Sequence, residues 1–116
     1  MTKLFPLMAL VLLAPLAGDQ DVSSRLFEAL SKVENCANWN NPGCLRYAKQ
    51  KGAKRGPRGY AVFKTKALGE RALALQIQRH AGETIAEFVR HYNPKVKGYL
   101  KKVLDASDGL KDTDIL

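Results

Sequence analysis

The chain has 116 residues, and its 19 Lys and Arg against 11 Asp and Glu give a formal net charge of +8. This length excludes two domains with separate cores, because a small domain buries only a modest share of its surface. The positive charge predicts an anionic partner, or a solvated face that keeps the protein soluble.

The first eighteen residues have the pattern of an export signal. Lys3 precedes the apolar run LFPLMALVLLAPL, and the small residues Ala17 and Gly18 follow at the expected cleavage point. The run is shorter than the roughly 20 apolar residues that span a bilayer. We therefore expect a signal peptide over residues 1–18, with a retained N-terminal anchor helix as the alternative. The remainder, residues 19–116, is expected to be one domain with its core at about residues 22–106.

The segment SSRLFEALSKVEN has apolar residues at helical spacing and predicts an amphipathic helix. Glu34 falls on its last turn, where the negative end of the helix dipole raises the proton affinity of a carboxylate. A general acid requires such a raised pKa, although an isolated surface glutamate is the ordinary interpretation.

The next segment, NCANWNNPGC, is rich in Asn, Pro and Gly and predicts irregular backbone with turns. It contains both cysteines of the chain, Cys36 and Cys44. Export into an oxidising compartment favours their pairing as a disulfide. Free thiols or a metal site are the weaker alternatives, because the two histidines lie too far along the chain for zinc-ligand spacing. We predict no metal and no cofactor, and assign His80 and His91 no role.

The residues from Asn35 to Gly69 include no acid. Their basic residues are Arg46, Lys49, Lys51, Lys54, Arg55, Arg58, Lys64 and Lys66. We interpret KQKGAKRGPRG as a flexible basic loop and YAVF, residues 60–63, as a short edge or hairpin strand.

Helical periodicity returns from Thr65. The residues from Thr84 to Glu87 have the form of a capping box and predict a short helix through Tyr92. We expect Asn93 and Pro94 to begin a last helix, and the acidic tail to be frayed. The predicted fold is mainly α, with one short β element and a basic loop.

Two segments, NNPGCLRY and GYAVFKTKALGERALALQIQRHAGETIAEFVRHYNP, carry an ordered set of motifs. They resemble bacterial and phage proteins with NNPGN(I/L)R, then FA(I/V)F, an E-x-G-x-x-A-L helix, G-x-T-I-x-x-(F/I)(I/V) and aromatic-x-P. The resemblance covers roughly residues 30 to 105. It extends more faintly to lysozyme-like glucosaminidases and lytic transglycosylases. The chain departs from it at Cys44, which replaces an asparagine, and at Gly69, which precedes Glu70.

The resemblance implies a small lysozyme-like domain in which Glu34 is the catalytic acid. It assigns substrate binding to the loop and to a tyrosine from a late helix, here Tyr92. The loop residues are Asn40, Asn41, Gly43, Arg46 and Tyr47. Both asparagines are at least as well explained by bonds to loop backbone. Trp39 is interpreted as a core residue or as a platform for a sugar ring.

Two-carboxylate glycoside cleavage needs a second acid within about 5 to 9.5 Å, and the facing loop has none to offer. A lytic transglycosylase works with one glutamate, which favours this class for an exported enzyme acting on the peptidoglycan glycan strand. The basic residues Lys51, Lys54, Arg55 and Arg58 would contact anionic polymer.

Two other classes remain as alternatives. One is a non-catalytic wall-binding or virion structural module on the same scaffold. The other is a cationic protein that binds nucleic acid or anionic lipid, which we do not expect because no aromatic residues interleave the basic loop. We expect a periplasmic or secreted monomer without a membrane anchor after signal cleavage.

Overall fold

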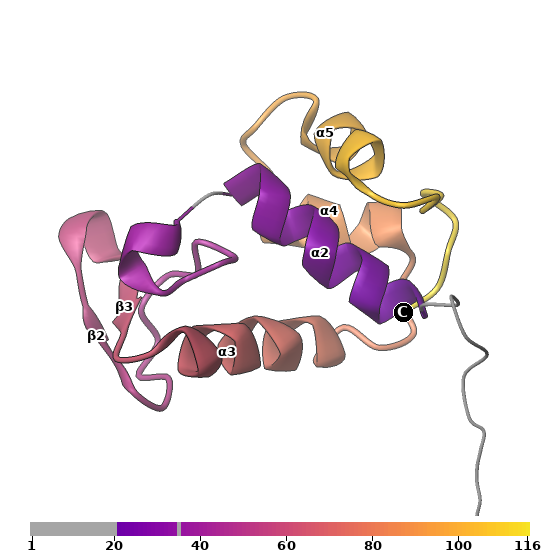
Figure 1. Cartoon of the computed structure of the whole chain (residues 1–116). Helices are drawn as coiled ribbons and strands as arrows, with labels where there is room; N and C mark the ends of the chain where they lie inside the picture. Colours follow the sequence, from indigo (N-terminus) through magenta and orange to yellow (C-terminus); the bar gives the residue numbers. More distant parts are fainter. Residues whose placement is uncertain (1–20, 35) are drawn as a thin grey trace, which may run out of the picture.

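The structure, a computed structural model, describes residues 21–34 and 36–116 (Figure 1). Its elements are α2 (Val22–Glu34), the 3₁₀ helix η1 (Ala37–Trp39), β2 (Ala53–Arg55), the 3₁₀ helix η2 (Pro57–Gly59), β3 (Ala61–Phe63), α3 (Lys66–Gln78), α4 (Ile85–Tyr92) and α5 (Tyr99–Ala106). The predicted mainly α fold with a short β element is confirmed. The predicted signal peptide lies outside the described residues. Within the described part of the chain, no helix has the length and apolar character needed to cross a membrane.

The four helices α2, α3, α4 and α5 form what we call the helical region. In it α2 packs against both α3 and α5, and α4 packs against α5 (Figure 1). The buried apolar side chains that hold it together are Leu26, Ala29, Leu30, Leu73, Ile77, Ile85, Phe88, Val89, Tyr99, Val103 and Leu110. They come from all four helices and from the tail, so the core joins segments far apart in the chain.

The start of α4 forms as the sequence predicts. The backbone N–H of Glu87 donates to the hydroxyl of Thr84 at 3.1 Å, and the N–H of Thr84 donates to the Glu87 carboxylate at 2.8 Å. This reciprocal capping box satisfies donors that a helix start leaves without intrahelical partners.

The predicted start of the last helix at Asn93 and Pro94 is wrong. Asn93 instead ends α4, its N–H donating to Val89 O at 3.1 Å, and α5 begins at Tyr99. Gly98 has a left-handed backbone with φ of 76°, which interrupts any helix running from Pro94 into α5. The side chain of Asn93 is thereby free to approach Glu34.

The C-terminal tail is not frayed. The carbonyls of Asp112 and Asp114 accept the N–H groups of Ala86 and Ile85, at 3.0 and 2.9 Å, and Leu110 is buried. Because the first N–H groups of a helix have no intrahelical acceptor, the tail supplies acceptors for α4. The core therefore extends beyond the predicted boundary near residue 106.

Residues 36–63 form what we call the hairpin region. The antiparallel strands β2 and β3 pair Ala53 with Phe63 and Arg55 with Ala61. The segment that the sequence predicts as a flexible basic loop thus contains β2, because β3 offers its backbone groups as a partner. The hairpin lies beside the start of α3, away from α5 (Figure 1).

The hairpin region meets the helical region at a glycine of α3. Gly69 is buried, and a Cβ at this position would overlap the backbone carbonyl oxygen of Asn40. Only glycine therefore allows α3 to pack this closely against the loop after η1.

Candidate functional site

Glu34 is the last residue of α2, at the junction of the two regions. The loop after it returns to the helix end, where Cys36 and Cys44 form the predicted disulfide with Cα atoms 5.3 Å apart. The Sγ of Cys44 lies 3.0 Å from the carbonyl oxygen of Glu34. The disulfide thus holds the loop against the residue that carries the candidate acid.

The Glu34 carboxyl group is half-buried between α2, α4 and α5. The hydroxyl of Tyr99 donates to its Oε2 atom. Burial raises the pKa of Glu34, and hydrogen bonding by Tyr99 and then Asn93 opposes that rise. The direction agrees with the sequence prediction, and loss of solvent around the carboxyl group is its main cause.

Two tyrosines, Tyr92 and Tyr99, lie next to Glu34 in the site. The hydroxyl of Tyr92 donates to the carbonyl of Gly43 at 2.5 Å, and the Tyr92 and Tyr99 rings stack with centroids 6.5 Å apart. Burial first, and then the nearby Glu34, raises the pKa of both tyrosines, so both remain hydrogen-bond donors. Sequence reasoning chose Tyr92 for the cleft and gave Tyr99 no role in the site. The hydroxyl group of Tyr99, which stands among Val and Leu residues at helical spacing, was the feature of the sequence that could have indicated this role.

A cavity of about 660 Å³ opens beside Glu34. It is lined by residues from the end of α2, the loop 44–51, α3 and the end of α4. The basic side chains around it are Arg46, Lys49, Lys51, Arg71 and Arg79. Glu34 carries the sole carboxylate among the described lining residues. The charged side chains of the wall would therefore attract an anionic ligand more than they repel it.

The structure divides the predicted site residues into two groups. Arg46, Lys51 and Tyr92 line the cavity with Glu34. Four others do not contribute to the described lining: Asn40, Asn41, Gly43 and Tyr47. Sequence reasoning did not select the α3 residues Arg71 and Arg79, because nothing in the sequence indicates that this face of α3 turns toward Glu34.

The two asparagines bind backbone. Asn41 is fully buried, and its Nδ2 donates to Leu45 O and Ala61 O, both at 2.9 Å. Its Oδ1 accepts from Leu45 N at 2.9 Å, while Asn40 Nδ2 donates to Phe63 O at 3.0 Å. These amides connect the loop to β3, so they shape the site without facing it.

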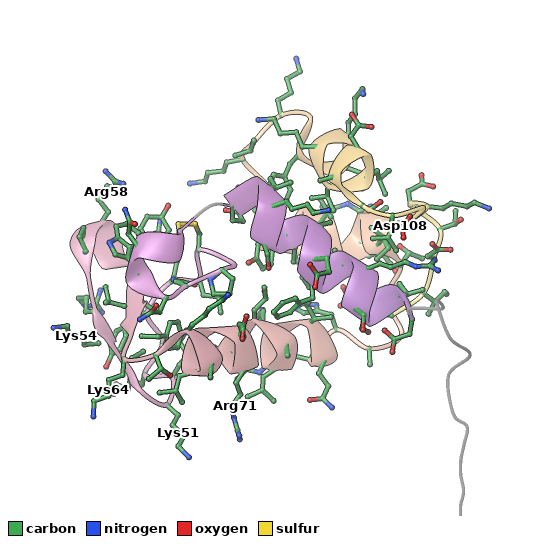
Figure 2. The ribbon with its side chains drawn as sticks, in the orientation of Figure 1. Lys51, Lys54, Arg58, Lys64, Arg71 and Asp108 are labelled. Atoms are coloured by element: carbon green, nitrogen blue, oxygen red, sulfur yellow. A yellow bond between two sulfur atoms is a disulfide. The ribbon has the colours of Figure 1, made fainter. Side chains whose placement is uncertain are left out.

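Three basic residues of the hairpin region lie outside the cavity. Lys54, Arg55 and Arg58 are exposed, and Figure 2 shows Lys54 and Arg58 pointing away from the body of the protein. Lys64 also points outward, and Lys51 and Arg71 extend from the cavity wall toward solvent, whereas Asp108 lies at the opposite end of the molecule (Figure 2). The molecule is therefore electrostatically polar, with its positive end at the hairpin.

An aromatic cluster lies beside these charges. The half-buried Trp39 stacks on Tyr60 with ring centroids 5.5 Å apart, and the Arg46 guanidinium lies 4.9 Å from the Tyr60 ring centroid. A similar contact of 5.3 Å joins Arg55 to Tyr47. Such contacts fix the hairpin arginines.

One described cluster has the residues to bind a metal. His80, Glu83 and His91 bring three potential ligand atoms within 4.8 Å of one another. The hydrogen bond to His80 is the first cause that lowers the pKa of Glu83. The paired cysteines are not available as ligands. Sequence reasoning missed this cluster because it compared the histidines with the cysteines and not with Glu83.

Comparison of the chain with profiles of known protein families, with curated proteins and with solved structures gives no match. The geometry of the site therefore carries the functional argument by itself.

Proposed function

We propose that the protein cleaves the glycan strand of peptidoglycan in a lytic-transglycosylase-type reaction, with Glu34 as both acid and base. One observation carries this proposal: Glu34 is the sole carboxylate in the described lining of a basic cavity, and burial raises its pKa. A raised pKa increases the fraction of the carboxyl group that carries a proton at any given pH, and a general acid requires that proton.

The reaction needs no second carboxylate. Protonated Glu34 gives its proton to the glycosidic oxygen as the bond from that oxygen to the anomeric carbon breaks. The substrate's N-acetyl group stabilises the positive charge on the sugar. Glu34 then takes the proton of the sugar's 6-hydroxyl, whose oxygen bonds to the anomeric carbon, and a 1,6-anhydro end forms. The carboxyl group ends as it began, and no water is consumed.

Tyr99 supports this role for Glu34. Its hydroxyl donates to Oε2, and its raised pKa keeps it protonated when Glu34 is ionised. Oε2 is therefore stabilised as an acceptor, and the carboxyl group is fixed in orientation. Because Tyr92 binds Gly43 rather than Glu34, its contribution is to hold the loop wall of the cavity.

The basic wall supports an anionic substrate. A volume of about 660 Å³ is within the usual range of small-ligand sites. The carboxylates of muramic acid and of the peptide stems match the guanidinium and ammonium groups of Arg46, Lys51 and Arg71. The disulfide supports an exported setting, where paired cysteines persist.

The test is mass spectrometry of purified sacculi after incubation with the protein and with Glu34→Gln. We expect anhydro ends from the unmodified protein and a rate about 10²- to 10⁴-fold lower from the variant, which lacks the acid. Glu28→Gln is the matched control, since Glu28 is exposed on the same helix. Products with reducing ends, or equal rates for both variants, would contradict the proposal.

The exposed basic residues of the hairpin favour a second candidate, a non-catalytic module that binds the wall. Lys54, Arg55 and Arg58 lie on the surface outside the cavity. For this candidate, exchanging all three for Glu abolishes co-sedimentation with sacculi, whereas Glu34→Gln leaves it unchanged. The same exchange at Lys95, Lys97 and Lys102 is the control for net charge, because these exposed lysines lie in α5 and in the segment before it rather than in the hairpin region.

A further inference from the structure

The turn between α3 and α4 gathers both histidines of the chain around one carboxylate. His80 and Glu83 belong to this turn, and His91 lies in the last turn of α4. The N–H of His80 donates to Ile77 O, and the N–H of Glu83 donates to His80 O, each at 3.0 Å. These bonds fold the turn so that the three side chains lie together.

The distances within the cluster are close to those of a metal site. His80 Nδ1 lies 3.0 Å from Glu83 Oε2, and His91 Nδ1 lies 3.4 Å from Glu83 Oε1. All three ligand atoms lie within 4.8 Å of one another. Two ligands of a tetrahedral zinc ion, each at about 2.1 Å, lie roughly 3.4 Å apart. The three atoms are therefore spaced close to the separation that ligands of one zinc ion have.

The surroundings hold the His80 ring in place and leave one oxygen of Glu83 poorly satisfied. The His80 ring packs edge-on against buried Phe88 with centroids 5.1 Å apart, and its Nε2 lies 3.4 Å from the Gln76 amide nitrogen. Glu83 Oε1 is buried and lacks a hydrogen-bond partner of good geometry. The His91 ring nitrogen lies 3.4 Å from it, and a cation placed between Glu83 and the histidines would give this oxygen a closer partner.

We propose that His80, Glu83 and His91 bind one zinc ion through Nδ1, a carboxylate oxygen and Nδ1. Two imidazoles and one carboxylate are a ligand set that zinc uses when a further position stays open to water or to a ligand. His91 also lines the cavity beside Glu34, so the ion would lie at the cavity edge. It would brace the α3–α4 turn and add positive charge to the basic wall.

Calorimetric titration of untagged protein with zinc chloride tests the site, because the chain has no histidine outside the cluster. We expect one ion per chain and a higher melting temperature with zinc. His91→Ala is the main variant, since its side chain is 59% exposed and contributes little to packing. We expect it and Glu83→Gln to lose more than about tenfold in affinity, and Glu28→Gln to keep it.

Histidine ring resonances give an independent measurement, since both rings belong to the proposed site. One equivalent of zinc should shift the signals of both. Absence of heat and of shifts at up to about 1 mM zinc, where even weak sites fill, would overturn the proposal. Unchanged affinity in folded His91→Ala would overturn it as well.

Discussion

The helical region and the hairpin region are stabilised by different forces. Apolar side chains from four helices and the tail fill the helical core. In the hairpin region, Ala61 and Phe63 are buried beside the Asn41 amide, and a disulfide closes the loop. Directional bonds thus replace much of the apolar burial where the chain approaches Glu34. A region held by a few specific bonds keeps a precise shape but loses it when one bond is removed.

The largest expected effect is that of Asn41→Leu. The substitution leaves Leu45 N and Ala61 O without a hydrogen-bond partner, at roughly 1 to 3 kcal/mol for each group, whereas Leu45 O keeps the backbone N–H of Ala61 at 3.0 Å. We expect a loss of about 4 kcal/mol in unfolding free energy by chemical denaturation.

Hydrogen exchange would locate this loss. Amides of residues 41–63 should lose protection before those of α2, α4 and α5. Asn40→Gly is the control, because glycine accepts the positive φ of 51° and the change removes one hydrogen bond. Uniform loss of protection across both regions would contradict the distinction between them.

Gly69→Ala tests the contact between the regions. Alanine normally stabilises a helix interior by about 1 kcal/mol relative to glycine. Here its Cβ would overlap the Asn40 carbonyl, so we expect a net loss of about 3 kcal/mol in thermal unfolding. Ala74→Gly, at an exposed position of the same helix, measures the propensity difference alone and should cost about 1 kcal/mol. A gain in stability for Gly69→Ala would show that the two regions can separate freely.

Removal of the disulfide should have a somewhat smaller effect. Closing a loop with a sequence separation of 8 restricts the unfolded chain, so replacing both cysteines with alanine should cost about 2 to 3 kcal/mol. The loss should coincide with faster proteolysis within residues 36–63, while α3 and α5 stay protected. Equal proteolysis in both regions would indicate that the disulfide acts on the whole domain.

The smallest effect concerns the pH dependence of Glu34. Because burial raises the folded pKa of Glu34 above its ordinary value of 4.5, this group stabilises the fold at acidic pH, and that contribution is lost as the pH rises through the folded pKa. Glu34→Gln should therefore melt at a higher temperature than the unmodified protein at neutral pH, with the difference shrinking toward pH 4. Thermal melts across this range measure it. A difference independent of pH would mean that Glu34 ionises as freely in the fold as in the unfolded chain.

Local patterns predicted most of the helical region. Apolar spacing predicted α2, and the Thr84 and Glu87 pair predicted the start of α4, because both depend on neighbours within one or two turns. The predicted start of α5 was wrong because Gly98 takes a left-handed conformation. The side chain of Asn93 forms a hydrogen bond with Glu34 instead of capping that helix. The tail and β2 depend on partners distant in the sequence, which periodicity does not reveal.

The candidate site shows the same division. Glu34 and the cysteines were identified from local context. The roles of Tyr99 and Arg71 follow from the packing of α5 and α3 around the end of α2, which no short motif records. Asn41 was predicted to bind substrate because its amide can donate and accept hydrogen bonds, but in the fold this amide bonds to the backbone of Leu45 and Ala61 instead.

The buried amide of Asn41 has a consequence for how this protein can change. By tying Leu45 to Ala61, it closes the base of the excursion formed by residues 46–60. Substitutions or insertions at the tip would then leave the geometry at Glu34 undisturbed. The outer end of this segment can therefore change in sequence during evolution. Related proteins could then bind different partners at this surface and keep the same arrangement around Glu34.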